Sequence, residues 1–472
     1  MNLPSSSLPL PDRHQAIAAV LGRARELRAQ LGDTLYDETA AATYAQAGAI
    51  TNRVIRCTPP RSIDWESTLD AALTSRLLGF PIMVGLLGVV LWLTIAGANV
   101  PSALLADLLF WVEDLLSGLF AALHAPWWLE GFLIQGVYRG LAWVVAVMLP
   151  PMMIFFPCFT LLEDLGYLPR VAFNLDRLFS RAGGSGKQAL TMTMGFGCNA
   201  AGVTACRIID SPREKLIAIV TNNFVPCNGR WPTLIMVASI FVGGAGGAIY
   251  ASLAAAATVV GLTVLGVIVT LVASWALSRT VLKGELSAFT LELPPYRKPR
   301  VLRILHTSMI DRTIFVLGRA MVMAAPAGGV CWLLANIDVG GVSLFAHLAG
   351  TLDGPGRLMG LDGIILMAFI LGLPANEIVV PILIMGYLSQ GAMLELDSLE
   401  DVRALLVDQN GWTLVTAVCV MLFSLLHYPC STALWTIHRE TGSWKWTLLS
   451  FALPTGVAIV ACVFVAQTSR LF

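Results

Sequence analysis

The sequence predicts an all-α protein that crosses a membrane several times, with about seven to ten transmembrane helices. Hydrophobic residues make up 56% of the 472 residues and charged residues only 13%, whereas an average soluble domain contains roughly 25% charged residues. Several apolar stretches reach the roughly 20 residues that a helix needs to cross a bilayer. These observations exclude a soluble enzyme. Thirty basic residues balance thirty acidic residues, so no net charge favours nucleic acid as a partner.

The first 76 residues precede the apolar segments and are expected to form a cytoplasmic N-terminal segment with a small helical hairpin. Apolar residues recur at helical spacing from Arg13 to Leu31, and a second helical stretch runs from Thr39 to Ile55. The start of the chain lacks a basic region followed by an apolar core, so we expect no cleavable signal peptide.

Nine later stretches are apolar enough to lie in a membrane. Seven are expected to be full spans, at 77–98, 136–160, 216–240, 250–282, 314–336, 411–435 and 447–468. The other two, 188–205 and 361–388, contain Gly, Pro or Asn and fit broken or re-entrant helices. Such helices persist at membrane depth only where they line a cavity enclosed by protein.

The charges between the spans predict the orientation, because cytoplasmic loops collect Lys and Arg. Residues 99–135 contain four acidic residues and no Lys or Arg, and residues 389–410 contain five acidic residues against one Arg. We expect both segments to lie outside. Residues 163–187 and 283–312 carry clusters of Arg and Lys, so we expect these segments and the N-terminus to be cytoplasmic.

Two parts of the chain resemble each other. Gly195–Asn199 (GFGCN) is echoed by Gly372–Asn376 (GLPAN), and each follows a proline-bearing span and precedes a Pro-Cys pair, at Cys227 and Cys430. With the expected topology, these parts form two gate-type repeats of opposite orientation, an arrangement that many secondary transporters use around a substrate site near the midplane.

The repeats divide the chain into six parts. They are the N-terminal segment 1–76, a first span with an acidic external loop at 77–135, repeat 1 at 136–242, a connecting region with a basic cytoplasmic loop at 243–312, repeat 2 at 313–440 and a C-terminal span at 441–472.

The breaks collect groups that bind metals. A proline within a span frees a backbone carbonyl and opens the helix beside Cys227 and Cys430, and Cys198 lies in a glycine-rich break. The candidate ligands are therefore Cys198, Cys227, Cys430, Asn199, Asn376 and Glu377. Thiolates suit iron, zinc or copper, whereas magnesium and calcium prefer oxygen ligands, so this mixed set predicts a divalent transition metal as substrate.

Each candidate has a structural alternative. A cysteine in an apolar helix is usually a small hydrophobic residue, and we assign that role to the remaining cysteines, Cys57, Cys158, Cys206, Cys331, Cys419 and Cys462. Glu377 is an ionisable residue at membrane depth, where such residues are costly and usually functional. Its alternative role is that of a structural partner for Asn376 or for a nearby backbone amide.

Several longer strings make the chain similar to the membrane domain of the ferrous iron transport protein B family, FeoB. They are RIIDSPREK at 207–215, NNFVPCNGR at 222–230, LPANE at 373–377 and PCSTALWTIHRETGSWKW at 429–446. The resemblance implies two inverted gate repeats and an Fe²⁺ permease of the bacterial inner membrane. It also implies that Cys198, Cys227 and Cys430 are the cysteines implicated in that family.

The chain departs from the family pattern at its start, because family members usually begin with a cytosolic GTP-binding domain. About 75 residues precede the first span, too few for a GTPase domain of about 160 residues. The string GGSGK at 183–187 is not a phosphate loop, since Arg181 and Gln188 replace its required Gly and Ser or Thr. We therefore expect no enzyme activity and no cofactor bound by this chain, with GTP acting only through a separate GTPase subunit.

Two alternatives stay open at this point. In the first, the chain is a permease for Mn²⁺ or Zn²⁺, since ligand softness does not separate these ions from Fe²⁺ sharply. In the second, it is a non-transporting membrane protein that docks a GTPase. The sequence leaves open whether the chain forms a homo-oligomer, and whether passage is channel-like or by alternating access.

Overall fold

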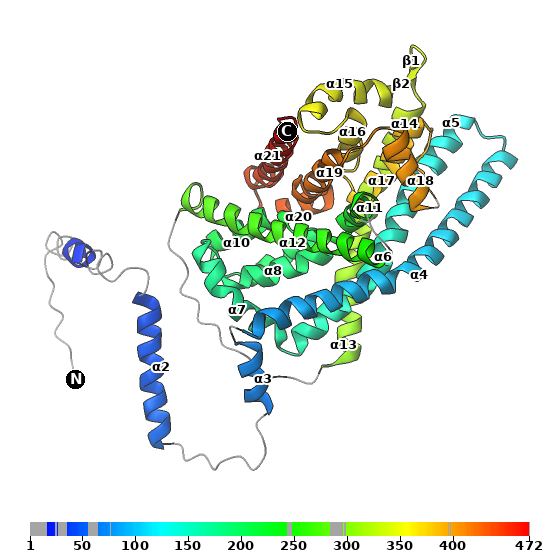
Figure 1. Cartoon of the computed structure of the whole chain (residues 1–472). Coiled ribbons are helices and arrows are strands. Elements are labelled where there is room, and N and C mark those ends of the chain that lie inside the picture. The colour runs from blue at the N-terminus through cyan, green and yellow to red at the C-terminus, as the bar shows by residue number, and fades with distance from the viewer. Residues whose placement is uncertain are drawn as a thin grey trace. The chain divides into compact units, whose positions relative to one another are not determined.

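The computed structural model describes residues 17–23, 26, 35–54, 65–75, 77–242, 248–283, 296, 299–394, 396 and 398–471. The chain divides into two compact units, which we describe separately (Figure 1). The first consists of Met1–Thr68 with Ser287–Glu292, and the second consists of Leu69–Leu286 with Leu293–Phe472.

The first unit contains the N-terminal helices. α2 (Leu35–Val54) confirms the second helical stretch expected from the sequence. The first expected stretch, Arg13–Leu31, lies partly outside the described residues, and those of its residues that are described are helical. α3 (Trp65–Leu73) leads from this unit into the second.

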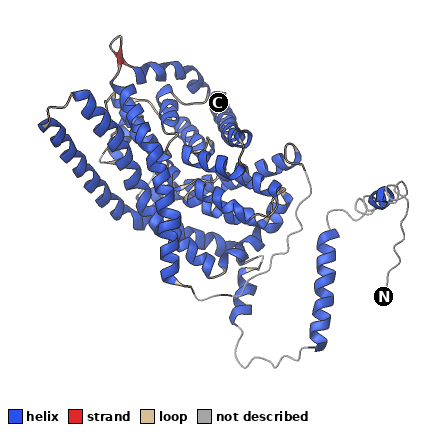
Figure 2. Ribbon diagram, turned by 180° about the vertical axis from the view of Figure 1, so that it is seen from behind, coloured by secondary structure: helices blue, strands red, loops and turns tan. Residues whose placement is uncertain are grey.

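The second unit is built almost entirely of helices (Figure 2). Its first half contains α4 (Gly79–Ala122), α5 (Trp127–Glu130), α6 (Arg139–Asp164), α7 (Tyr167–Arg181), α8 (Gly186–Gly197), α9 (Asn199–Ala205), α10 (Pro212–Thr221), α11 (Trp231–Phe241) and α12 (Ala248–Arg279). Its second half contains α13 (Val301–His306), α14 (Phe315–Asn336), α15 (Leu344–Leu358), α16 (Gly363–Leu371), α17 (Val379–Leu388), α18 (Leu399–Arg403), α19 (Leu414–Leu426), α20 (Ser431–Thr441) and α21 (Trp444–Ser469). Within the described residues the strands are β1 (Asp338–Val339) and β2 (Val342–Ser343), an antiparallel hairpin whose turn residues Gly340 and Gly341 have positive φ.

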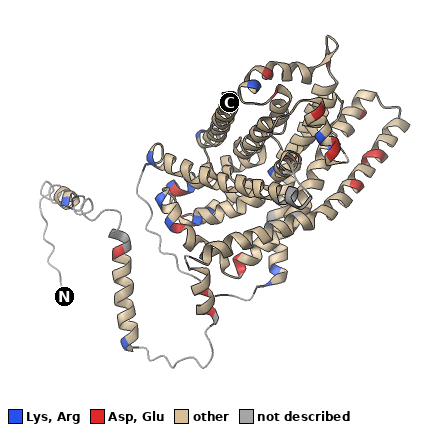
Figure 3. Ribbon diagram, viewed as in Figure 1, with Lys and Arg blue, Asp and Glu red and all other residues tan. Residues whose placement is uncertain are grey.

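The membrane-spanning character predicted from the sequence is confirmed. In the described part of the chain, six helices are long and apolar enough to cross a membrane, or seven if α15 and α16, bent by 109° at their junction, form one span. Seven is the lower end of the expected range of seven to ten, and six lies just below it. Lys, Arg, Asp and Glu are sparse along these helices (Figure 3). Most of the expected external loop 99–135 is helical, because α4 alone has 44 residues.

Two expected spans, 216–240 and 411–435, are interrupted in the structure. The stretch 216–240 is divided between α10 and α11, and the backbone around Pro226 is extended at Val225 and Cys227. The second Pro-Cys pair interrupts the helical structure between α19 and α20 in the same way, with extended backbone at His427 and Cys430. Proline alone does not open a helix here, because α6 and α14 continue through their prolines.

The core of the second unit surrounds these interruptions. Its largest buried apolar side chains include Phe156, Phe179, Phe224, Leu234 and Ile382, each less than 2% exposed. They belong to α6, α7, the first break, α11 and α17. The interrupted helices are therefore packed inside the bundle, where irregular backbone is tolerated at membrane depth.

Candidate metal path

A helical hairpin occurs twice in the second unit, as α7–α8 and as α15–α16. In the first copy Asp176 Oδ1 accepts a hydrogen bond from the Gly186 amide at 2.7 Å, and in the second Asp353 Oδ1 accepts one from the Gly363 amide at 2.7 Å. Both pairs of counterparts are 177 positions apart in the sequence. Sequence reasoning missed these helices, since it treated 163–187 as a loop. The usable signal was the Asp ten residues before the Gly that opens each broken helix.

The two breaks that follow these hairpins have matching backbone. Cys198 has φ −155° and ψ 125°, and its counterpart Ala375 has φ −152° and ψ 121°. Helical backbone resumes directly afterwards, at Asn199 and Asn376. The breaks predicted for 188–205 and 361–388 are therefore confirmed at the predicted residues. The two hairpins lie toward opposite ends of the unit, with α7 at one end and α15 at the other (Figure 1).

The side-chain oxygens of Asn199 and Asn376 are buried and accept no hydrogen bond from any residue that the structure describes. Asn199 donates through Nδ2 to Asn223 Oδ1 at 3.3 Å, which leaves its own oxygen free. A buried polar atom without a partner is costly and uncommon in native proteins. The same unsatisfied atom recurs at equivalent positions of both breaks, so both breaks present an oxygen that is available to a cation.

A fully buried arginine joins the two Pro-Cys breaks. Arg230, which is 0% exposed, donates through Nη1 to the carbonyls of Asn223 (2.8 Å) and Leu425 (2.7 Å). Through Nη2 it donates to the carbonyls of His427 (3.0 Å) and Tyr428 (3.1 Å). These carbonyls belong to the interrupted backbone beside Cys227 and Cys430, and the guanidinium replaces the amide donors lost there. Sequence reasoning missed Arg230, although an arginine at membrane depth is itself a functional signal.

Further hydrogen bonds connect all four breaks. Asn222 Nδ2 donates to the Asn199 carbonyl at 3.2 Å, and Asn223 Nδ2 donates to the His427 carbonyl at 2.7 Å. The Ser431 amide donates to the Leu373 carbonyl at 2.8 Å. The breaks at 198, 222–230, 372–376 and 427–430 therefore form one polar centre inside an apolar bundle.

The three predicted cysteines are gathered at this centre. Cys198 and Cys227 are 7% and 8% exposed, and Cys430 is half-buried. All three are free thiols, and they lie close enough to one another and to Glu377 for their charges to interact. In the described part of the chain, no group of three or more His, Cys, Asp or Glu side chains is arranged closely enough to hold a metal ion. The predicted ligands therefore lie near one another without forming a closed coordination shell in the described residues.

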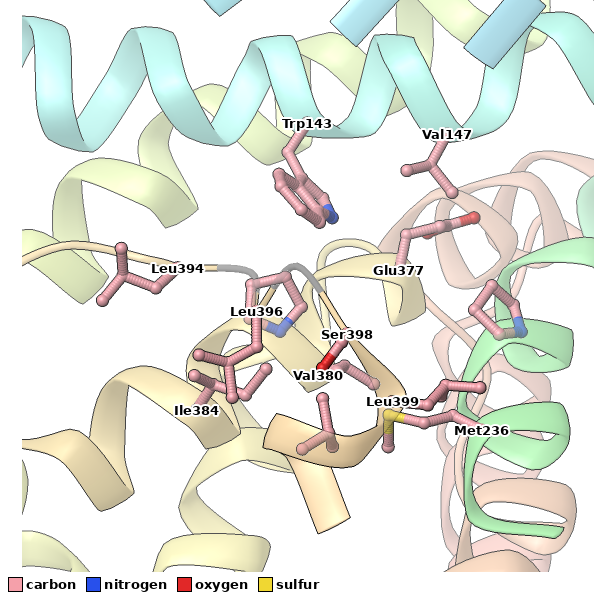
Figure 4. Close-up of a pocket in the computed structure, with 13 residues that line it drawn as sticks. Trp143, Val147, Met236, Glu377, Val380, Ile384, Leu394, Leu396, Ser398 and Leu399 are labelled. Carbon is pink, nitrogen blue, oxygen red and sulfur yellow. The ribbon is translucent and has the colours of Figure 1, made fainter. Parts of the chain in front are cut away.

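Glu377 faces this centre from the start of the helix after its break. Its side chain lies against Gly229, where an added Cβ would be 2.5 Å from Glu377 Cδ. Only 8% of the residue is exposed. It also lines a cavity of about 350 Å³ between α6, α11, α17 and the segment 394–402 (Figure 4). Within the described residues, no hydrogen bond joins the Glu377 side chain to Asn376, its alternative partner in the sequence analysis.

Ion pairs link the repeats at the end that carries α7. Arg207 binds Glu440 bidentately, and Lys215 Nζ lies 3.7 Å from Glu440 Oε2. The hydrogen bond to Glu440 raises the pKa of Arg207 further above its usual value. Lys187 lies 2.5 Å from Asp210 and lowers the pKa of that carboxyl. Gly183–Ser185 lies in the turn between α7 and α8, and Gly186 and Lys187 begin α8, so a helix precedes this string where a phosphate loop has a strand.

Comparisons with known proteins agree with this architecture. The Gate family model, described as "Nucleoside recognition", matches residues 145–241 and 317–444, which enclose the two sets of breaks. The model described as "Ferrous iron transport protein B C terminus" matches residues 259–311 between them. The chain belongs to the FeoB family. No solved structure matches it.

Curated relatives align with most of this FeoB-family chain. The Fe(2+) transporter FeoB of Staphylococcus aureus (strain COL) is 28% identical over 86% of the chain and 60% of the relative. The protein of the same name from Synechocystis is 27% identical over 85% of the chain and 62% of the relative. A Porphyromonas gingivalis fusion of Fe(2+) transport protein A and FeoB is 23% identical over 86% of the chain and 51% of the relative. The chain spans about 60% of the length of these transporters.

Proposed function

We propose that this chain is a membrane permease for ferrous iron, in which the ion passes Cys198, Cys227 and Cys430 between two inverted repeats. The observation that supports this most strongly is the polar centre. Four backbone breaks meet there, and they bring three thiols and two unpartnered amide oxygens together inside an apolar bundle. A receptor or a purely structural bundle has no need for this costly arrangement, whereas a transporter uses it to hold an ion without its water.

The ligand chemistry favours a borderline-soft divalent cation. The three thiols prefer iron, zinc or copper, and the oxygens of Asn199 and Asn376 add neutral donors. These groups do not close around one point, which suits permeation, because an ion must leave each site as well as enter it. Glu377 supplies the negative charge that offsets part of the cost of moving a dication into the bundle.

The repeat geometry supports inverted repeats. The hairpins α7–α8 and α15–α16 share capping aspartates and break conformations at a constant sequence separation, and they lie toward opposite ends of the unit. The end with α7 carries Arg177, Arg181, Lys187, Arg207 and Lys215. By the preference of basic residues for the cytoplasm, this end faces the cytoplasm of a bacterial inner membrane, on the same side as the N-terminus.

The relatives named Fe(2+) transporter FeoB carry the metal assignment. We further propose that GTP acts through a GTPase outside the segment described here, docked on the basic cytoplasmic end. Permeation of Mn²⁺ or Zn²⁺ is the remaining alternative within transport, and GTPase docking without transport is the alternative outside it.

Uptake of radioactive iron into metal-starved cells under reducing conditions tests the proposal. Cells that express the chain should take up more Fe²⁺ than cells with an empty vector, and excess Mn²⁺ or Zn²⁺ should compete weakly. A GTPase supplied in trans should raise the rate. Replacing all three cysteines with Ser should abolish uptake while leaving GTPase recruitment intact; normal function of this triple variant would instead identify a docking protein.

A further inference from the structure

The cavity beside Glu377 has features of an ion site that differ from those of the cysteine centre. It measures about 350 Å³. One wall is Trp143 and Val147 of α6, which project toward it, and the opposite wall is Val380 and Ile384 of α17 (Figure 4). Its third side is formed by Leu394, Leu396, Ser398, Leu399 and Val402. These belong to the acidic segment 389–410, which the charge distribution places outside the membrane.

Apart from Glu377, the described lining residues offer few groups that bind a cation. The polar side chains among them are Ser398 and Trp143, and the others are aliphatic residues, prolines and Met236. Walls of this kind cannot replace the water ligands of a metal ion. A cation in the cavity would therefore keep its hydration shell and interact with the protein through that shell.

The size of the cavity matches such an occupant. Six first-shell waters take up about 180 Å³, since the share of one water in the liquid is about 30 Å³. The cavity of about 350 Å³ therefore accommodates a hydrated divalent ion together with additional water. A bare metal ion would leave most of the space empty and its coordination incomplete.

Among the lining residues that the structure describes, Glu377 is the one with an ionisable side chain. The residue is more than nine-tenths buried, and its side chain lies between the cavity and Gly229, two positions after Cys227. In the part of the chain that the structure describes, no Lys, Arg or His forms an ion pair with it. A buried carboxylate without a positive partner is costly, and a cation in the cavity would satisfy it.

Resting on the proposed function, we infer that this cavity is an entry chamber for a hydrated divalent cation. The ion enters from the outer side with its water shell intact and is held by Glu377 through bridging waters. It exchanges water for protein ligands only when it moves past Glu377 toward Cys227. Because recognition in the chamber is electrostatic and depends on the water shell, the chamber admits Mg²⁺, Mn²⁺ and Fe²⁺ alike. Selection among metals takes place afterwards, at the thiols.

Thiol labelling on intact cells tests the chamber without requiring transport. Val380→Cys places a thiol on the inner wall, and Gln409→Cys places one on an exposed part of the outer segment outside the lining. The unmodified chain gives the background from the native cysteines. A positively charged, membrane-impermeant methanethiosulfonate is the reagent. Hexaamminecobalt(III) is the probe, because its ligands do not exchange and it imitates a hydrated cation that cannot shed its shell.

We expect Val380→Cys to be labelled from outside and the cobalt complex to slow this labelling. At four times its Kd the slowing should be about fivefold. Labelling of Gln409→Cys should not change at matched ionic strength. Protection should disappear when Glu377→Gln is added to Val380→Cys and persist in part with Glu377→Asp, a pair of variants that separates the charge from the integrity of the fold.

Three results would overturn the inference: no labelling of Val380→Cys from outside, equal protection at both positions, or full protection without the carboxylate. Since the labelling is read on the protein itself, it is independent of uptake. Protection in a chain that moves no iron would contradict only the proposed function. Iron uptake without protection would contradict only the chamber.

Discussion

Gly229→Ala adds a single methyl group to the proposed path, directly beside the carboxylate of Glu377. In Gly229→Ala the new methyl group would overlap Glu377 Oε1 and lie 2.5 Å from Cδ and 3.0 Å from Oε2. Carbon atoms pack at about 3.5–4.0 Å, so the carboxylate must move by roughly 1 Å. The backbone at Gly229 does not adopt positive φ, so alanine itself fits there without backbone strain.

The effect on stability should be small. Moving Glu377 away from its preferred rotamer costs about 0.5–1.5 kcal/mol, and replacing Gly with Ala returns about 0.4–1 kcal/mol by restricting the unfolded chain. The free energy of unfolding should therefore change by less than about 1 kcal/mol. Transport should change much more, because disturbing the groups around a metal ligand commonly lowers metal affinity about 10–100-fold.

The assay is the initial rate of iron uptake as a function of external Fe²⁺, at matched expression. We expect the half-saturating concentration to rise about tenfold in Gly229→Ala, at the low end of that range. Gly391→Ala is the matched control, since its methyl group would lie 2.6 Å from Asn336 Oδ1, away from the path. It should leave uptake unchanged.

A double-mutant cycle identifies the cause. If Gly229→Ala acts by displacing the carboxylate, it should add little to the defect of Glu377→Gln, because contacting residues are not additive. Full additivity, or normal uptake by Gly229→Ala, would refute the reasoning.

Three further predictions concern stability. Arg230→Met removes the described donor of the Asn223, Leu425 and Tyr428 carbonyls, whereas the His427 carbonyl keeps its hydrogen bond from Asn223. Each unpaired carbonyl costs about 1–3 kcal/mol, so little folded protein should survive detergent extraction and size-exclusion chromatography, while Arg230→Lys should recover part of it. Equal yields would contradict the role of Arg230 in joining the two Pro-Cys breaks. Glu440→Gln weakens the pairing with Arg207 and should lower the free energy of unfolding by about 1–2 kcal/mol, seen as a lower Tm; an unchanged Tm would show that this pair contributes nothing. Arg170 donates to Asp70 and holds the pKa of that carboxyl below its usual value. The contribution of this pair to the free energy of unfolding is therefore complete above about pH 5 and is lost as pH falls through the lowered pKa. The Tm difference between the unmodified chain and Asp70→Asn should be constant from pH 5 to pH 8 and shrink below about pH 4; a difference that grows on acidification would contradict this prediction.

The sequence predicted the interruptions well because they depend on local chemistry. Gly195–Asn199 and Gly372–Asn376 combine glycine or proline with asparagine, and each residue type disfavours a continuous helix by itself. The prolines before Cys227 and Cys430 were correctly assigned to openings. Prolines inside α6 and α14, by contrast, leave the helix continuous. The opened backbone at the Pro-Cys pairs has a distant hydrogen-bond donor, Arg230, for its carbonyls. No local sequence pattern predicts which carbonyls this side chain binds.

Other features could not be derived from charge and hydropathy. Loop charges report the side of the membrane but not whether the backbone is helical, so the acidic residues after 99 concealed the continuation of α4. α7 is amphipathic and rich in arginine, and therefore resembled a cytoplasmic loop. The unsatisfied oxygens of Asn199 and Asn376 and the cavity at Glu377 depend on tertiary packing alone.

The central claim is that iron passes the three cysteines at the breaks. The most direct test is radioactive iron uptake by Cys198→Ser, Cys227→Ser and Cys430→Ser, each expressed at the level of the unmodified chain. Cys462→Ser is the matched control, since Cys462 is fully buried and hydrogen-bonded to the Cys419 carbonyl, away from the breaks. We expect each of the three variants to lose most of its uptake and the control to retain it. Normal uptake by all three would contradict the proposed path and return these cysteines to the role of small core residues.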